Sequence, residues 1–207
     1  MTKKQKAHYI IDELEKLYPN PAIPLDHFNH FTLLISVLLS AQTTDKKVNE
    51  VTPALYKVAD SPEKMVKLSI EEIKEFIKQI GLSNTKAKNI FTLSKILIEK
   101  HNGIVPSNYE DLENLPGVGH KTASVVMSQG FNFPAFPVDT HIHRLMTLWK
   151  LTSGKNVEQT EKDAKKIFKK ELWNKLHLQI IYYGREFSPA RGRNIDKDFI
   201  TKTILEK

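Results

Sequence analysis

The sequence of 207 residues contains no cysteine. The absence of thiols excludes disulfide bonds, zinc ribbons, cysteine-bound iron–sulfur clusters and a thiol nucleophile. Glycine (8 residues) and proline (10 residues) are also scarce, and they stand mainly between segments whose apolar residues have a helical spacing. Long apolar runs are missing too, because the longest, residues 31–41, has only about half the length that a membrane span needs. These absences favour a soluble and mainly helical protein.

Acidic residues are fewer than basic ones: the sequence has 24 Asp and Glu and 31 Lys and Arg, which gives a net charge of +7. A basic excess favours polyanionic partners, and nucleic acid before a membrane surface. The basic residues 1–6 lead into an amphipathic stretch, residues 7–17, and not into the apolar core of a signal peptide. We therefore expect a cytoplasmic protein that has a nucleic-acid partner and no contact with a membrane.

The spacing of apolar residues predicts an all-α fold. Residues 28–41 are apolar nearly all round, as expected of a central buried helix. Ser69 and Glu72 form a capping-box pattern that starts a helix, and Gly81 ends it. No strand pattern of useful length and no internal repeat are found. The predicted helices span residues 7–17, 28–41, 45–59, 62–68, 70–80, 84–100, 108–113, 119–130, 139–150, 157–169 and 171–183.

One segment, residues 108–130, carries a motif with a specific chemistry. A short helix ends at Leu115, a turn with the sequence Pro-Gly-Val-Gly follows, and a second helix begins at once. The two glycines allow positive φ and close approach of a ligand, while the helix N-terminus directs backbone N–H groups outward, where they bind phosphate. The pattern Leu-Pro-Gly-Val-Gly-His-Lys-Thr-Ala is typical of a helix-hairpin-helix, which binds the DNA backbone without sequence preference. The alternative, a plain turn with glycine caps, is disfavoured by the full match of nine residues.

Lys121 and Asp139 are candidate catalytic residues. Lys121 stands in the first turn of the second hairpin helix, where the helix dipole disfavours an ammonium group. Either its side chain simply points at solvent or a phosphate, or the dipole and partial burial lower its pKa and provide an amine nucleophile. Asp139 opens a helix, and it is either an ordinary N-cap or a carboxylate that takes a proton and stabilises positive charge on a sugar.

Further segments resemble, in order, the endonuclease III family of DNA glycosylases, and the resemblance covers roughly residues 8–190. It implies two all-α lobes with the active site in the groove between them. The first is a six-helix barrel, residues 23–133, that includes the hairpin, and the second joins residues 1–22 to residues 134–207. The matching segments are residues 34–45, 80–90, 101–106, the hairpin, 138–144, 154–158 and 184–185.

The resemblance also implies an activity and a set of site residues. Lys121 matches the lysine that forms a Schiff base with the sugar, and Asp139 matches the catalytic aspartate. The family removes oxidised pyrimidines from duplex DNA after flipping the nucleotide, and the imine then permits β-elimination at the abasic site. Gln42 and Leu82 match residues that fill the gap left by the flipped nucleotide. The DNA-binding residues implied are Gln42, Leu82, Leu115, Pro116, Gly117, Val118, Gly119, His120, Thr122, His141, Arg144, Arg191 and Arg193.

No metal site is expected, although the hairpin carbonyls are a candidate site for a monovalent cation. His141 and His143 are spaced i, i+2, which does not place both on one face of a helix. Trp149 and Trp173 are expected in the core. The partner implied is double-stranded DNA with a damaged base or an abasic site, bound by a monomer that associates with the nucleoid if the source is bacterial.

The sequence departs from the family at its C-terminal end. Most members carry a four-cysteine loop that binds a 4Fe-4S cluster, and the corresponding positions here are Ser188, Ile195, Asp198 and Ile204. We therefore expect no cluster and no other cofactor. Residues 194–207 instead predict a short amphipathic helix, whose apolar packing takes over the structural role of the cluster. The side chains expected on its packed side are Ile195, Phe199, Ile200, Thr203 and Ile204.

Two alternatives to an oxidised-pyrimidine glycosylase and lyase stay open. The first is a glycosylase of the same fold that acts on uracil or mismatched thymine, because one sequence does not identify the residues of the base pocket. The second, from another class, is a non-catalytic helix-hairpin-helix protein that binds DNA. The presence of both Lys121 and Asp139 disfavours that second alternative.

Overall fold

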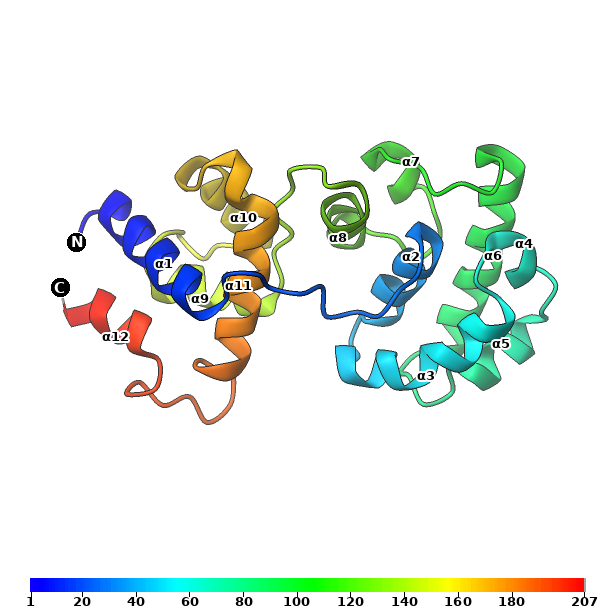
Figure 1. The fold of residues 1–207 in the computed structure, drawn as a ribbon, viewed down its shortest axis with the longest axis horizontal. Helices are drawn as coiled ribbons and strands as arrows, with labels where there is room; N and C mark the ends of the chain where they lie inside the picture. Colours follow the sequence, from blue (N-terminus) through cyan, green and yellow to red (C-terminus); the bar gives the residue numbers. More distant parts are fainter. Residues whose placement is uncertain (207) are drawn as a thin grey trace. The chain divides into compact units, whose positions relative to one another are not determined.

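The computed structural model describes residues 1–206 and contains only helices as regular secondary structure over that range (Figure 1). The predicted all-α fold is confirmed. The chain forms two compact units: residues Ile23–Asn132, here called the hairpin unit, and residues Met1–Ala22 together with the segment from Phe133 onward, here called the terminal unit. Lys207, the last residue of the predicted second lobe, lies outside the described residues. No helix among the described residues combines the length and the apolar character needed to cross a membrane.

The hairpin unit is built around α2, which buries every side chain except that of His30. Helices α8, α3 and α6 pack against it, and in Figure 1 α2 lies between α8 and α6. The predicted helix 28–41 is shorter in the structure because Asn29 caps its N-terminus. The helices of this unit are α2 (His30–Leu39), α3 (Asp45–Val58), α4 (Pro62–Met65), α5 (Ile70–Phe76), α6 (Ser83–His101), α7 (Tyr109–Glu113) and α8 (His120–Phe131).

The terminal unit brings the two ends of the chain together. Helix α11 packs on α9 and on α1, and α1 also contacts α12, so both termini lie at the same end of this unit in Figure 1. The predicted helix 171–183 is divided into a 3-10 turn and a longer α-helix. The elements are α1 (Lys3–Leu17), α9 (Thr140–Leu148), α10 (Val157–Ile167), η1 (Lys170–Leu172), α11 (Trp173–Glu186) and α12 (Phe199–Glu206).

The C-terminal segment forms a helix as predicted, but it begins later, at Phe199. Asp198 precedes this helix and its Oδ1 accepts from the backbone N–H of Thr201 at 3.3 Å, which is the geometry of an N-cap. Ile195 therefore lies in the turn before the helix and is 37% exposed, so its predicted place on the packed side was wrong. The buried side chains of α12 are Ile200, Thr201 and Ile204.

Apolar contacts and a buried hydrogen-bond network both hold α12 in the terminal unit. The Tyr183 hydroxyl donates to Asp198 Oδ1 at 2.8 Å and accepts from the Ile200 N–H at 3.0 Å. The Trp149 indole N–H donates to the Thr201 hydroxyl at 3.0 Å, and Trp149 is fully buried as expected. Phe199 meets the rings of Tyr183 and Phe187 edge-on. Trp173, also expected in the core, is only partly buried.

We predict that Ile204→Ala lowers the free energy of unfolding by about 2–5 kcal/mol, because it leaves a cavity under α12. The matched control is Leu205→Ala on the same helix, where the side chain is 49% exposed and the expected change is within about 0.5 kcal/mol. Urea unfolding at neutral pH measures both. Equal effects of the two variants would show that α12 contributes no specific packing.

Candidate nucleic-acid interface

The hairpin turn is anchored by apolar side chains and presents backbone at its outer side. Leu115 and Val118 are buried in the core of the hairpin unit, and the Val118 N–H donates to the Leu115 carbonyl at 3.1 Å. Gly119 is the N-cap of α8 and no side chain caps this helix. The N-terminal N–H groups of α8 therefore carry the partial positive charge that binds an anion.

The two hairpin glycines serve different purposes. Gly117 has a φ of +80°, where a side chain is strained, and an added Cβ would lie 2.6 Å from the amide nitrogen of Asn89. Gly119 has a φ of −94°, which any residue adopts, and a Cβ there would meet nothing within 4 Å. Gly117 is thus required by the conformation of the turn. Gly119 instead keeps the space in front of the helix N-terminus open for a ligand.

Lys121 stands in the first turn of α8, as predicted, and its side chain is exposed. Of the two alternatives for Lys121, the structure shows the side chain exposed to solvent and not the partly buried one. His120 lies beside it, with Nδ1 2.7 Å from Glu113 Oε1 and its ring stacked on Tyr109. These contacts link α7 to α8 and fix the two arms of the hairpin.

Gln42 and Leu82, the predicted gap-filling residues, share an unusual backbone conformation. Gln42 has a φ of 57° and Leu82 a φ of 60°, and both side chains are exposed. Non-glycine residues in this left-handed region cost about 1–3 kcal/mol each. Sequence reasoning passed over Lys86, which lies close to both. The sequence does indicate the burial of Lys86, because Lys86 lies on the same apolar face of α6 as Ile90, Leu93 and Leu97.

Asp139 is the N-cap of α9, and its Oδ1 accepts from the Ile142 N–H at 2.8 Å. Its second oxygen, Oδ2, has no hydrogen-bond partner among residues 1–206 and is left for another donor. Asp139 therefore caps α9 with Oδ1 while Oδ2 stays available for a reaction. The cap also fixes the carboxylate relative to α9.

Three basic side chains surround Asp139 in the terminal unit. Burial lowers the pKa of His141 and of Arg144, while the nearby Asp139 carboxylate opposes both shifts. Burial lowers the pKa of His177 to about 4, and Asp139 opposes this shift as well. His177 is fully buried, with Nδ1 donating to the Trp173 carbonyl at 3.1 Å and Nε2 without a partner among the described residues. His177 is not among the residues predicted from the sequence.

Arg144, predicted to contact DNA, is held by the protein itself. Its Nη2 donates to the carbonyls of Ser188 and Gly184 and lies 3.2 Å from His141 Nδ1. This arrangement depends on Gly184, since a Cβ there would come within 3.0 Å of the His141 Cβ. By contrast, Arg191 and Arg193 are exposed in the segment between α11 and α12. Arg144 therefore orders the end of α11, whereas these two arginines face solvent.

The four positions that correspond to the family's cluster cysteines do not form a donor set. Ser188 and Asp198 are buried, Ile195 is exposed, and Ile204 belongs to the apolar core of the terminal unit. Two of the four side chains have no atom that binds iron. Residues 1–206 also contain no group of three or more His, Cys, Asp or Glu side chains that would hold a metal ion. The residues present therefore do not fit an iron–sulfur cluster.

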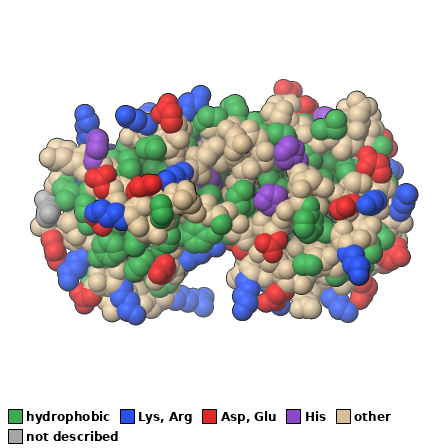
Figure 2. Space-filling view, in the orientation of Figure 1, with side chains coloured by type: hydrophobic (Ala, Val, Ile, Leu, Met, Phe, Trp, Pro, Cys, Tyr) green, Lys and Arg blue, Asp and Glu red, His purple; other side chains and the backbone are tan. Residues whose placement is uncertain are grey.

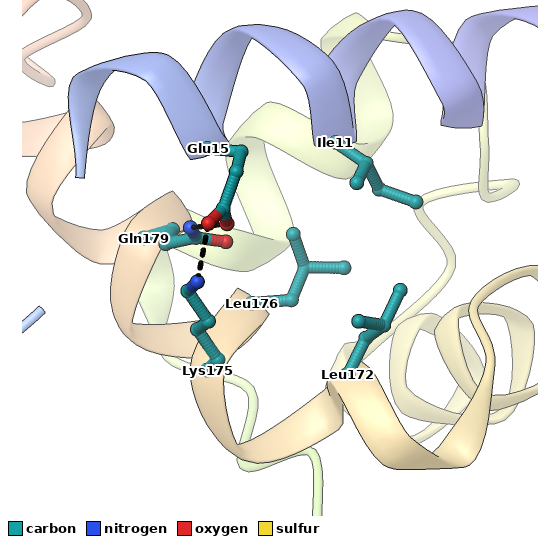
Figure 3. A pocket seen from close by; sticks show the side chains of 6 residues that line it. All are labelled: Ile11, Glu15, Leu172, Lys175, Leu176 and Gln179. Carbon is teal, nitrogen blue, oxygen red and sulfur yellow. Dashed lines mark hydrogen bonds and ion pairs between the residues drawn. The ribbon is translucent and has the colours of Figure 1, made fainter. Parts of the chain in front are cut away.

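A pocket of about 260 Å³ lies elsewhere in the terminal unit, between α1 and the start of α11 (Figure 3). Lys175 pairs with Glu15 at 2.6 Å, and the Gln179 amide donates to the same carboxylate at 3.1 Å. Ile11, Leu172 and Leu176 form its apolar side. None of the predicted site residues lines it.

Figure 2 shows basic side chains scattered among acidic ones on the face drawn, so the positive net charge is not gathered there in one patch.

Comparisons with known proteins agree on one family. Residues 35–170 match the model of the HhH-GPD superfamily of base excision DNA repair proteins. The chain is 45% identical to endonuclease III of Escherichia coli K12 over 91% of this chain and 89% of that protein. It is 43% identical to endonuclease III of Treponema pallidum over 89% and 88%.

Solved structures give the same result. A trapped covalent intermediate of endonuclease III with DNA matches with a TM-score of 0.90 at 40% identity, covering 95% of this chain and 92% of that one. A non-covalent endonuclease III–DNA complex matches with a TM-score of 0.92 at 38% identity over 100% of both chains. A thermostable thymine-DNA glycosylase, at 23% identity and a TM-score of 0.85 over 96% and 94%, shares the fold.

The buried His177 predicts a pH dependence of stability. Its pKa of about 4 in the folded protein lies below the value of about 6.5 in the unfolded chain, so the unfolded chain binds the extra proton first. Stability is therefore complete above pH 6.5 and falls as the pH drops toward 4. We predict that this group alone removes about 2 kcal/mol between pH 7 and pH 4.5.

Urea unfolding of His177→Gln at both pH values measures this contribution, because glutamine is a polar side chain of similar size that does not titrate. The variant should lose less stability on acidification than the wild type. His8→Gln, at an exposed position on α1, is the matched control and should behave as the wild type does. An unchanged pH slope in His177→Gln would contradict the assignment.

Proposed function

The chain belongs to the endonuclease III family, within the HhH-GPD superfamily of base excision DNA repair proteins, and we propose that this DNA glycosylase and abasic-site lyase removes oxidised pyrimidines from duplex DNA through Lys121 and Asp139. The observation that carries the proposal is the presence of both side chains at special positions. Lys121 is exposed at the N-terminus of the hairpin helix α8, and Asp139 caps α9 with one oxygen to spare.

The chemistry requires an amine and a carboxylate. The deprotonated Lys121 amine attacks C1′ of the flipped nucleotide, an N–C1′ bond forms, and the base leaves with the electron pair of the glycosidic bond. Asp139 accepts a proton from the attacking amine and stabilises the positive charge that develops on the sugar. The C1′–O4′ bond of this adduct then breaks, O4′ takes a proton, and the opened sugar is held to Lys121 as an imine. The imine acidifies the C2′ proton, and its loss expels the 3′ phosphate with the electron pair of the C3′–O bond. Lyase activity therefore follows from the same covalent intermediate.

The hairpin supplies affinity for the DNA backbone. The open space before Gly119 and the N–H groups at the start of α8 suit one phosphate oxygen, while Gly117 shapes the turn. The exposed Arg191 and Arg193 add two positive charges on the terminal unit. Because such contacts release condensed counterions, affinity for duplex DNA should fall steeply with salt concentration. We further propose that the enzyme acts as a monomer in the cytoplasm on double-stranded DNA.

We also propose that this enzyme works without an iron–sulfur cluster. The support is the lack of thiols in the sequence and the use of Ile204 and Asp198 to hold α12 in the place where relatives carry cysteines. Burial of α12 and the Tyr183–Asp198 hydrogen bond then give the terminal unit its stability.

Borohydride trapping tests the proposed chemistry, because the reagent reduces the imine and leaves a covalent protein–DNA adduct. With a duplex that carries thymine glycol, the wild type should give the adduct and Lys121→Ala should give none. Lys100→Ala, at an exposed position on α6, is the control and should give the wild-type yield. Asp139→Asn keeps the N-cap but not the base, so base release should slow by roughly 10²–10⁴-fold.

The outcomes separate the competing functions. Base release from uracil or mismatched thymine in place of thymine glycol would overturn the substrate class but keep the Lys121 chemistry. Binding of duplex DNA with no adduct on any lesion or abasic site would identify a non-catalytic binding protein.

The cofactor proposal has its own measurement. Protein purified without oxygen should contain far less than one iron atom per chain and should lack the visible absorption of a cluster, because no thiolate ligand exists. Expression with added iron and sulfide is the control for loss of a labile cluster. Stoichiometric iron and acid-labile sulfide under either condition would contradict the proposal.

A further inference from the structure

Two residues of the hairpin unit with exposed side chains have a backbone conformation that neither residue type prefers. Gln42 lies in the turn that joins α2 to α3, and Leu82 lies directly before α6, with φ values of 57° and 60°. The other non-glycine residues with positive φ among residues 1–206, Asn102, Asn132 and Lys150, follow the ends of helices, where left-handed backbone is the usual termination. Leu82 is also 60% exposed, so its side chain gains nothing from burial in the free protein.

A single buried lysine joins these two positions. Lys86 is 5% exposed, and its Nζ donates to the Leu39 carbonyl at 2.9 Å, to the Ala41 carbonyl at 2.7 Å and to the Thr43 hydroxyl at 3.3 Å. An ammonium group has three protons, so all of its donors are used. Two of the acceptors, on Ala41 and Thr43, stand on either side of Gln42.

The backbone of the same residue fixes the second position. The Lys86 N–H donates to the Leu82 carbonyl at 2.9 Å, which closes the first turn of α6. No side chain caps this helix, so the turn depends on the backbone alone. Lys86 therefore contacts the Gln42 turn through its side chain and the Leu82 position through its main chain.

The electrostatics explain why a lysine is tolerated in this buried place. The Leu39 and Ala41 carbonyls stand at and just beyond the C-terminus of α2, where the helix dipole favours a cation. Burial lowers the pKa of Lys86, whereas the two carbonyls favour the charged form by accepting hydrogen bonds from it. An apolar residue at this position would leave the Leu39 carbonyl without the Lys86 donor, and the Ala41 carbonyl with only the Thr43 hydroxyl, which lies at 3.5 Å.

We propose that Lys86 is a positioning residue that holds Gln42 and Leu82 at a fixed separation, so that both side chains enter the duplex together at the damaged base pair. The inference rests on the proposed function, since it assigns a role within the handling of duplex DNA. Without the lysine, the Gln42 turn loses its anchor to α6, and the two side chains no longer move as one rigid pair. Lys86 touches no reacting atom.

A double-mutant cycle tests the coupling. Lys86→Met keeps the length of the side chain and removes its donors, and it should lower kcat/KM on a thymine glycol duplex by roughly 10- to 100-fold. In a background that carries Gln42→Ala and Leu82→Ala, the same change should have an effect below about threefold, because there is no pair left to position. Lys88→Met removes the same charge from an exposed place on α6 and should stay within about threefold of the wild type.

A spectroscopic readout separates positioning from a general loss of stability. A 2-aminopurine placed opposite an abasic site becomes more fluorescent when its stack is opened, and wild-type binding should increase this signal. Lys86→Met should bind the duplex but give a smaller increase. If Lys86→Met does not fold, Lys86→Arg keeps the charge with a different donor geometry and should show the same coupling at smaller size.

The possible outcomes are distinct. Equal losses in the two backgrounds, or an unchanged fluorescence increase in a folded Lys86 variant, would overturn the proposal. A wild type without activity on any lesion would overturn the proposed function, whereas the fluorescence experiment on an abasic duplex would still test the role of Lys86.

Discussion

Burial of α2 on almost every side is the constraint on which the hairpin unit depends. A helix that is apolar all round has no free surface, so each neighbour must fit its side chains. The hairpin turn packs on Leu38, since an added Cβ at Gly117 would come within 3.1 Å of its methyl group. The far end of α8 meets Leu33 at Gly130 in the same way. The helix that carries Lys121 is thus located by one apolar surface.

The polar end of α2 has a comparable role. Its last carbonyl, on Leu39, accepts from Lys86, and the chain then turns through Gln42 into α3. Helix α2 therefore fixes the positions of α8, of α6 and of the turn that leads into α3, although these segments are distant from one another in the sequence. A site assembled in this way depends on core packing more than on the local sequence of its loops. The terminal unit follows the same rule, because α11 supports Asp139 through its contact with α9 and supports α12 through Tyr183.

The sequence predicted the parts of this structure that depend on local patterns. The first turn of α8 with Lys121, the Asp139 N-cap and the Ser69–Glu72 capping box follow from residue types at fixed spacing, and all are present. The exposure of Ile195 was not predictable, and that of Lys121 stayed one of two alternatives, because exposure depends on how far an element extends beyond its neighbours. Lys86 and His177 escaped notice for a related reason. Their acceptors and charges come from elements that periodicity does not place in space.

The same limit applies to Asp198. Compared with the cysteine positions of relatives, Asp198 is only a missing ligand, whereas in this fold it caps the start of α12 and accepts a hydrogen bond from the Tyr183 hydroxyl. A buried carboxylate with two donors is a different solution to the problem of fastening a chain terminus. This way of fastening α12 depends on the Tyr183 hydroxyl as a donor.

The uncapped start of α8 has a consequence for evolution of the chain. Serine, asparagine or aspartate in place of Gly119 would supply the missing side-chain cap, which stabilises a helix by roughly a few tenths of a kcal/mol relative to glycine. The same side chain would occupy the open space in front of the N–H groups, and an aspartate would also repel an anion. Selection for thermal stability alone would thus remove this glycine. At Gly119 the protein is therefore less stable than its fold permits, and the N–H groups at the start of α8 stay accessible to another molecule.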